Sequence, residues 1–393
     1  MKSISQTVRL FSDPSHYARE HRMQLSDILR PYWKEAEFSE LERLQMYGLS
    51  REDFVVTARL ADADVAVLPM TWNHYVTRGE TRAAASFIEM ARQAGRPVLS
   101  YVVGDEGVTV PPEFDDCWIV RAGGERRRRR KRQVAQPVFF DDPLSRYARL
   151  QDAAESVAAD RSARTDERPA VGFCGQASIS QVKVVTDVIR VLGRNAAYWL
   201  GMRHEEPQPL YPPALLRSRA LQILRESARV RTEFIIRARY RAGATGAASI
   251  EKTTREFFEN ILGTDYTLCV RGGGNFSKRL FETMAMGRVP LLVDTDCLLP
   301  FESQVSWADV VVRVPAQALR TLPEKVIEHF ARHRETGLAE VRQKCRRFWE
   351  ETLSFRGFHK QLARIILDSG ERSSGGASLA LGYQTRGMTI PAG

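Results

Sequence analysis

Residues 266–303 read YTLCVRGGGNFSKRLFETMAMGRVPLLVDTDCLLPFES, and this stretch predicts a strand, a glycine-rich turn, a helix and a second strand. Three consecutive glycines, Gly272, Gly273 and Gly274, allow the backbone to approach a ligand closely. The free amides at the start of the next helix, around Asn275 and Arg279, form a site for an anion. The stretch therefore predicts a phosphate-binding turn between a strand and a helix.

The charged side chains of this turn point to a nucleotide diphosphate. Arg271, Lys278 and Arg279 bring positive charge to the glycines. Glu282 follows Lys278 by one helical turn and supplies a hydrogen-bond acceptor near the same helix end. A nucleotide diphosphate needs cations for its phosphates and an acceptor for its ribose hydroxyls, and the turn offers both.

Length and composition favour an ordinary two-domain protein. The chain has 393 residues, of which 43% are hydrophobic, and it contains no uncharged apolar run of transmembrane length. The first 20 residues lack the apolar segment of a secretory signal. The five cysteines are scattered and form no C-x-x-C motif, which favours buried thiols in a reducing compartment. We therefore expect a cytoplasmic protein, with peripheral contact at the inner membrane face as an option.

The net charge of +10 is concentrated in one run, RRRRRKR, from Arg126 to Arg132. Without its seven charges the balance is 10 − 7 = +3. Three interpretations are open: a mobile surface loop, a contact with a polyanionic acceptor or an anionic membrane surface, and a nuclear-localisation or nucleic-acid segment. The run has no aromatic neighbours, which argues against nucleic acid as a partner.

Strands and helices alternate along the chain in two series, which predicts an α/β protein with two mainly parallel sheets. In the first series, residues 63–69, 97–103, 117–120 and 138–140 are predicted strands and residues 82–94 a helix. The second series has five predicted strands: the two of the glycine-rich stretch and residues 170–175, 233–237 and 310–314. Its predicted helices include residues 181–192 and 215–230. The predicted divisions are a first domain over 1–150, a linker over 151–168, a second domain over 169–345, closing helices over 346–368 and a disordered tail over 369–393.

The stretch from Arg271 to Glu282 resembles the exostosin signature, which is arginine–glycine followed by serine–x–arginine–x–x–glutamate. Similar positions continue through residues 287–290 (GRVP), residues 299–301 (LPF), Trp307 and residues 349–351 (WEE). The match is dense over roughly 45 residues and looser from 170 to 358. Animal exostosins carry an N-terminal membrane segment that is not seen here, so the chain looks like a soluble, bacterial-type relative.

Exostosin-like proteins form glycosyltransferase family 47. The resemblance implies a GT-B fold, with two Rossmann-like domains facing a central cleft and a C-terminal helix packing back across them. It also implies an inverting transfer from a nucleotide-sugar, usually a UDP-sugar, with Arg279 on the diphosphate and Glu282 on the ribose. Together with the charge argument, it predicts these donor-binding residues: Arg271, Gly272, Gly273, Gly274, Asn275, Ser277, Lys278, Arg279 and Glu282.

The acceptor, a glycan or glycolipid of surface polysaccharide synthesis, is expected to enter from the first domain. A base must take its proton, and it should lie on a loop after a strand of that domain. The candidates are Asp105 and Glu106, which we favour slightly, and His74.

No metal and no cofactor are expected. Asp294 and Asp296 form a D-x-D pattern that could hold Mg²⁺ or Mn²⁺ on a diphosphate, but the cationic turn already serves the phosphates. His329 and His333 have ligand spacing but lack a third ligand. They are better interpreted as a solvated helix face.

Two other functional hypotheses remain open. The chain could be a catalytically inactive, nucleotide-sugar-binding partner subunit of a glycosyltransferase complex. It could also bind nucleic acid through the arginine run. The sequence predicts no oligomeric state.

Overall fold

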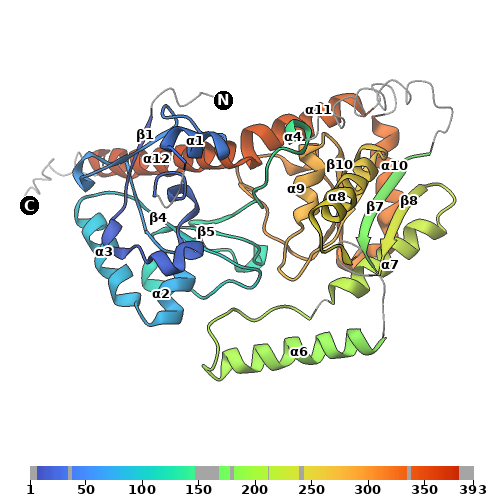
Figure 1. The fold of residues 1–393 in the computed structure, drawn as a ribbon, viewed down its shortest axis with the longest axis horizontal. Helices are drawn as coiled ribbons and strands as arrows, with labels where there is room; N and C mark the ends of the chain where they lie inside the picture. The colour runs from blue at the N-terminus through green and yellow to red at the C-terminus, as the bar shows by residue number, and fades with distance from the viewer. Residues whose placement is uncertain are drawn as a thin grey trace, which may run out of the picture.

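The computed structural model describes residues 7–33, 38–146, 168–177, 181–210, 212–238, 243–333 and 338–379. Figure 1 shows two α/β units side by side, with a long C-terminal helix running along both. The predicted linker lies outside the described residues except at Arg168.

The first unit is a six-stranded sheet of order β2-β1-β3-β4-β5-β6 in which all named strand pairs are parallel. Three of its inner strands, β3, β4 and β5, are short runs buried along their whole length, as expected when both faces of a sheet are covered. The strands are β1 (Val8–Phe11), β2 (Phe54–Thr57), β3 (Val65–Val67), β4 (Val98–Val102), β5 (Trp118–Arg121) and β6 (Gln133–Ala135), and the helices are α1 (Glu40–Met46), α2 (Trp72–Arg78) and α3 (Thr81–Gln93).

The second unit is a five-stranded parallel sheet of order β11-β10-β9-β7-β8. The strand order reverses between β7 and β9, and the crevice beyond their carboxyl ends is where such sheets bind ligands. The strands are β7 (Ala170–Gln176), β8 (Arg231–Arg237), β9 (Tyr266–Cys269), β10 (Val289–Asp294) and β11 (Val312–Pro315), and the helices are α6 (Gln181–Trp199), α7 (Pro213–Glu226), α8 (Ala247–Leu262), α9 (Lys278–Ala285), α10 (Leu322–Arg332) and α11 (Ala339–Phe348), with the short α4 (Pro143–Arg146) before them.

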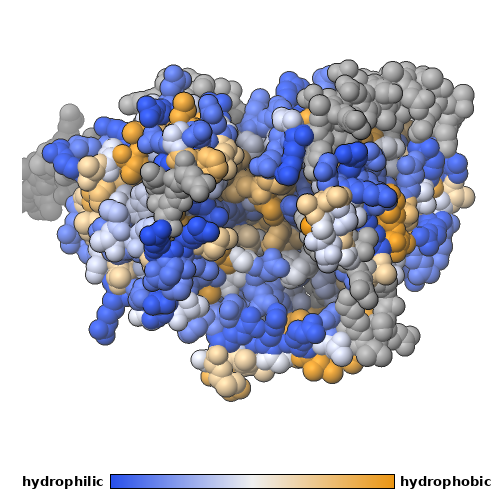
Figure 2. Space-filling model, in the orientation of Figure 1, coloured by the Kyte–Doolittle hydropathy of each residue, from blue (hydrophilic) through white to orange (hydrophobic). Residues whose placement is uncertain are grey.

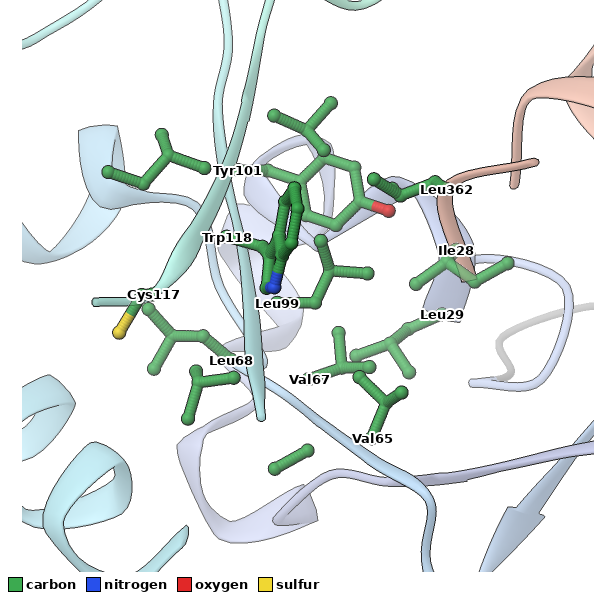
Figure 3. Packing of buried hydrophobic residues seen from close by; sticks show 14 of the residues in the cluster. Ile28, Leu29, Val65, Val67, Leu68, Leu99, Tyr101, Cys117, Trp118 and Leu362 are labelled. Atoms are coloured by element: carbon green, nitrogen blue, oxygen red, sulfur yellow. The ribbon is translucent and has the colours of Figure 1, made fainter. Parts of the chain in front are cut away.

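The chain then returns to the first unit. A π-helical turn (Trp349–Leu353) leads from α11 into α12 (Phe355–Leu379). Phe358 and Leu362 of α12 belong to the core of the first unit, and Figure 3 shows Leu362 beside Ile28 and Tyr101. Two parallel α/β sheets and a closing helix that crosses between them confirm the expected fold class.

Three details differ from the sequence-based expectation. Residues 138–140 are not a strand, because the sixth strand lies earlier at Gln133–Ala135 and Pro137, which has no N–H to donate, follows it. Strands β1 and β2 were not predicted. Residues 369–379 of the predicted disordered tail continue helix α12.

None of the helices in the described ranges is long and apolar enough to cross a membrane.

His359 of α12 is buried where the returning helix meets β4. Its ring nitrogens contact the Phe355 carbonyl at 2.8 Å and the Tyr101 hydroxyl at 3.0 Å, and the residue is 2% exposed. Burial lowers its pKa to about 4. The histidine of the unfolded chain has a pKa near 6.5. Between pH 4 and pH 6.5 the unfolded chain is therefore protonated at His359, whereas the folded chain is not.

We expect the free energy of unfolding to fall as the pH is lowered from about 6.5 to 4, by up to about 3 kcal/mol from His359. Urea unfolding across this range measures the fall. In a His359→Phe variant the fall should be smaller, whereas His204→Phe, at an exposed position, should leave it unchanged. An equal pH dependence in both variants would contradict the assignment.

Candidate functional site

A cavity of about 1450 Å³ opens at the reversal point of the second sheet. Its walls come from the end of β7, the glycine-rich turn after β9, the start of α9, and helices α7 and α8. Asp105 of the first domain also lines it, as do Val138, Phe140, Asp141, Pro143 and Arg146 from the segment after β6. The predicted donor residues on its wall are Gly272, Gly273, Ser277, Lys278, Arg279 and Glu282.

Arg279 places a cation in this wall without a carboxylate partner. Its Nη2 donates to the Cys174 carbonyl at 2.8 Å, and its guanidinium lies 4.2 Å from the ring centre of Phe173. Within the described ranges it forms no ion pair, and its buried Nε has no hydrogen-bond partner. Burial lowers its pKa. The strand end admits this guanidinium because Gly175 has no side chain: a Cβ there would lie 2.8 Å from Nη2.

Arg217 of α7 is a second such cation, and the sequence analysis missed it. Its Nη1 donates to the Gln176 carbonyl at 2.6 Å and its Nη2 to the Arg271 carbonyl at 3.4 Å, so it bridges the ends of β7 and β9. Burial, and then repulsion from Arg279, lowers its pKa to about 10. A signal was present in the sequence, since Arg217 shares a helix face with the apolar Ala220, Leu221 and Leu224.

The start of α9 leaves its amides available. Ser277 is the N-cap, but its side chain makes no capping hydrogen bond, so the first amides of the helix keep their capacity for another acceptor. Lys278 reaches Glu282 at 3.1 Å along the helix, and both line the cavity.

Arg271, Gly274 and Asn275, also predicted to bind the donor, do not line this cavity in the structure. Asn275 joins the two domains: its Nδ2 donates to the Gly124 carbonyl at 3.0 Å and its Oδ1 accepts from Thr295 at 2.6 Å. A Cβ on Gly274 would lie 2.6 Å from the Asp105 carbonyl. Arg271 is 3% exposed, and its Nη2 contacts the Gly273 carbonyl at 3.1 Å.

The three candidate bases lie in different places. Asp105 lines the cavity, and its Oδ2 approaches Gly273 so closely that a Cβ there would lie 2.5 Å away. Glu106 instead binds two arginines, Arg194 and, at 2.7 Å, Arg203. His74 is 4% exposed and lies 3.2 Å from Glu80, and burial is the main cause of its lowered pKa. The structure therefore brings only Asp105 to the predicted donor turn.

In the D-x-D pattern, Asp294 is paired with arginines. Asp294 lies 2.8 Å from Nη2 of Arg126 and 3.0 Å from Nε of Arg313, and Arg126 also reaches Glu302 at 3.1 Å. In the described ranges no group of three or more metal-ligating side chains is found. Arg126 comes from the first domain and Asp294 from the second, so the cluster connects them.

This contact corrects the interpretation of the arginine run as a mobile loop. A 3-10 turn (Arg126–Arg128) begins the run, and Arg127 and Arg128 pair with Glu125. Arg130 pairs with Asp115 at 2.6 Å. Much of the positive charge is thus neutralised within the protein, which weakens the case for a membrane contact through this run.

We expect Arg126→Ala to lower the stability of the protein by about 1–3 kcal/mol, because it removes a charged hydrogen-bond partner from the mostly buried Asp294. Arg128, whose side chain is 62% exposed, is the matched control, and Arg128→Ala should cost at most about 0.5 kcal/mol. Thermal unfolding of the two variants makes the comparison. Equal losses would mean that the Arg126 cluster adds nothing beyond an ordinary surface pair.

Comparison with known proteins gives short sequence matches and loose structural ones. No family model matches the chain. Two probable glucuronoxylan glucuronosyltransferases of Arabidopsis thaliana are 34% and 35% identical over 71 and 66 residues, and a probable glucuronosyltransferase of Oryza sativa subsp. japonica is 33% identical over 64 residues. These matches cover 16–18% of this chain and 14–15% of the relatives.

Two solved structures are similar over most of the chain. A glycosyltransferase from Rickettsia africae has a TM-score of 0.36 at 9% identity, covering 93% of this chain and 98% of that one. An α1,3-fucosyltransferase has a TM-score of 0.30 at 11% identity, covering 94% and 92%. At these scores the superpositions carry no argument, and the fold assignment rests on the strand order. The sequence matches support the resemblance to glycosyltransferases over a short stretch.

Proposed function

We propose that this chain is an inverting glycosyltransferase. It would move a sugar from a nucleotide-sugar, a UDP-sugar, to a glycan or glycolipid acceptor in surface polysaccharide synthesis. One observation carries the proposal. At the reversal point of the second sheet, two arginines that pair with no acidic side chain in the described part of the chain line a cavity together with an uncapped helix start, and Asp105 lines it from the other domain. The short similarity to proteins named as glucuronosyltransferases supports the same class.

In this proposal the donor diphosphate lies between Arg279, Arg217 and the first amides of α9. Carbonyl oxygens and an aromatic face now solvate these arginines, and an anion would form stronger, charge-assisted hydrogen bonds with them. Lys278 adds a third cation at the rim, and Glu282 accepts from the ribose hydroxyls. This much positive charge makes a divalent metal unnecessary in the proposed mechanism.

The transfer is a single displacement. Asp105 takes the proton of the acceptor hydroxyl while its oxygen attacks the anomeric carbon from the face opposite the diphosphate. A carbon–oxygen bond forms to the acceptor, the bond to the diphosphate breaks, and the configuration inverts. Charge grows on the departing phosphate oxygen, and the arginines and helix amides stabilise it from fixed positions.

We expect UDP to bind and Arg279→Gln or Arg217→Gln to weaken its affinity about 10- to 100-fold, because each removes a charge-assisted hydrogen bond. Arg219→Gln is the control, since Arg219 is exposed on the same helix as Arg217 and should leave affinity unchanged. Calorimetric titration with UDP, GDP and CMP measures these values. If none of the nucleotides binds, or if the control weakens binding equally, the donor site is wrong.

We expect Asp105→Asn to lower turnover about 100-fold or more with UDP affinity nearly unchanged, because a general base is lost and the donor contacts remain. His74→Gln should keep near-normal turnover, since His74 lies away from the cavity. Release of UDP from donor and acceptor reports the rate. Normal turnover in Asp105→Asn would assign the base elsewhere. Donor binding by the natural chain without transfer or hydrolysis would favour the inactive partner subunit.

A further inference from the structure

Asp105 lies in a turn whose own backbone does not fix it. Glycines stand on both sides of Asp105 and Glu106, and both of them, Gly104 and Gly107, take positive φ angles, of 86° and 71°. Such glycines allow a turn several conformations. Among the described residues, the Asp105 carboxylate has no partner in a hydrogen bond or an ion pair. Its place beside Gly273 must therefore be set by contacts that the rest of the turn makes.

A segment of the second domain pairs with this turn. It consists of residues 194–208, the end of α6 and the chain that follows, and we call it the anchor segment. Figure 1 places α6 along the lower edge of the molecule, and Figure 2 shows the surface hollowed above it, between the two units. The Glu206 amide donates to the Gly107 carbonyl at 3.1 Å, and Glu205 forms an antiparallel bridge with Val108. The turn is thus extended by a short piece of sheet from the other domain.

Glu106 connects the side chains of the turn to the anchor segment. Its carboxylate pairs with Arg194 and, at 2.7 Å, with Nη2 of Arg203. Arg121 of β5 lies on the other side of the turn, where its Nη2 donates to the Glu106 carbonyl at 3.4 Å and to the Glu206 carboxylate at 2.8 Å. Both the carboxylate and the carbonyl of the residue next to the proposed base are therefore held.

The anchor segment also reaches the glycine-rich turn. Asn195 closes the segment on itself through two hydrogen bonds with the backbone of Gln208, at 2.8 and 2.9 Å. The Gln208 side chain accepts from Nη2 of Arg271 at 3.4 Å, and the same nitrogen donates to the Gly273 carbonyl at 3.1 Å. The anchor segment therefore contacts both the turn that carries Asp105 and the turn that Asp105 approaches.

The exposure of the Glu106 pair separates a role in stability from a role in geometry. The side chains of Arg203 and Glu106 are 23% and 16% exposed, and ion pairs open to solvent contribute little to stability. The position of a reacting group has a much larger effect, because a displacement of about 1 Å can lower a rate about 100-fold. We therefore expect the pair to matter for rate more than for folding.

We propose that Glu106 and Arg203 are positioning residues, which hold the Asp105 carboxylate at the glycine-rich turn. The proposal rests on the proposed function, in which Asp105 takes the proton of the acceptor. It gives the second domain a part in placing the base of the first. Glu106 then acts through its neighbour and does not itself touch the substrate.

Substitution of Arg203 tests the proposal. Arg203→Met should lower turnover about 10- to 100-fold, with UDP affinity within about twofold of normal, because the proposed donor contacts are elsewhere. Arg203→Lys should keep most of the turnover, since it retains a charge and a donor. Arg231→Met is the matched control: Arg231 forms a similar partly exposed pair with Glu233 at 3.2 Å and lies away from the cavity. The control should turn over normally, and thermal unfolding should change little in all three variants.

Combined variants show whether the effect passes through Asp105. In the Asp105→Asn background, Arg203→Met should lower turnover no further, because no base remains to be positioned. Glu106→Gln should repeat the loss seen in Arg203→Met, and the two together should lose no more than either alone, since they remove the same pair.

Amide hydrogen exchange reports on the turn without any turnover. Exchange over residues 104–109 should become faster in Arg203→Met and stay unchanged in Arg231→Met, because only the first substitution frees the turn.

Four outcomes would overturn the positioning role and leave the proposed function standing. They are normal turnover in Arg203→Met, an equal loss of UDP affinity, a further loss in the Asp105→Asn background, and unchanged exchange over residues 104–109. A natural chain that transfers no sugar would instead overturn the proposed function, and the positioning role with it.

Discussion

Two arginines in the cavity wall of the second sheet, Arg217 and Arg279, form no ion pair with any carboxylate that the structure describes, and the local structure keeps them there. A buried guanidinium is costly unless its N–H groups and charge find partners. For Arg279 and Arg217 those partners are backbone carbonyls at the ends of β7 and β9, together with the ring of Phe173. The glycine at 175 is part of the same arrangement, because a side chain there would displace the Arg279 guanidinium. The result is a pair of guanidinium groups in the cavity wall, at the position where a parallel sheet of this order binds its ligand.

The contacts between the domains decide what reaches that cavity. Close packing of Gly273 and Gly274 against the 105 loop carries Asp105 from the first domain to the glycine-rich turn. Two further contacts connect the domains in this region: Asn275 donates to the Gly124 carbonyl, and Arg126 pairs with Asp294. Helix α12 completes the connection by burying Phe358 and Leu362 in the first core. At Gly273 and Gly274, where a diphosphate site was predicted, the structure shows a close approach of the opposite domain.

These contacts also explain two motifs that mislead when they are considered alone. The D-x-D pattern resembles a metal site until Arg126 and Arg313 are placed beside Asp294. The arginine run resembles a free polycation until its carboxylate partners, from residues 115, 125, 294 and 302, are found. The arginine run and the D-x-D pattern neutralise each other through Arg126 and Asp294, which are 168 residues apart in the chain.

The sequence by itself determined the elements whose signal is local. Short apolar runs and amphipathic periods predicted most strands and helices. The residues from Gly272 to Glu282 predicted the strand–turn–helix unit that lines the cavity, because they are neighbours in the chain. Strands β1 and β2 were missed, since four-residue strands carry little pattern. Tertiary structure alone decided that Arg217 joins Arg279, that Asp105 rather than Glu106 or His74 lies at the turn, and that Asn275 joins the domains. Those outcomes depend on side chains from distant segments that meet at the ends of the strands. No pattern along the chain indicates which distant side chains come into contact.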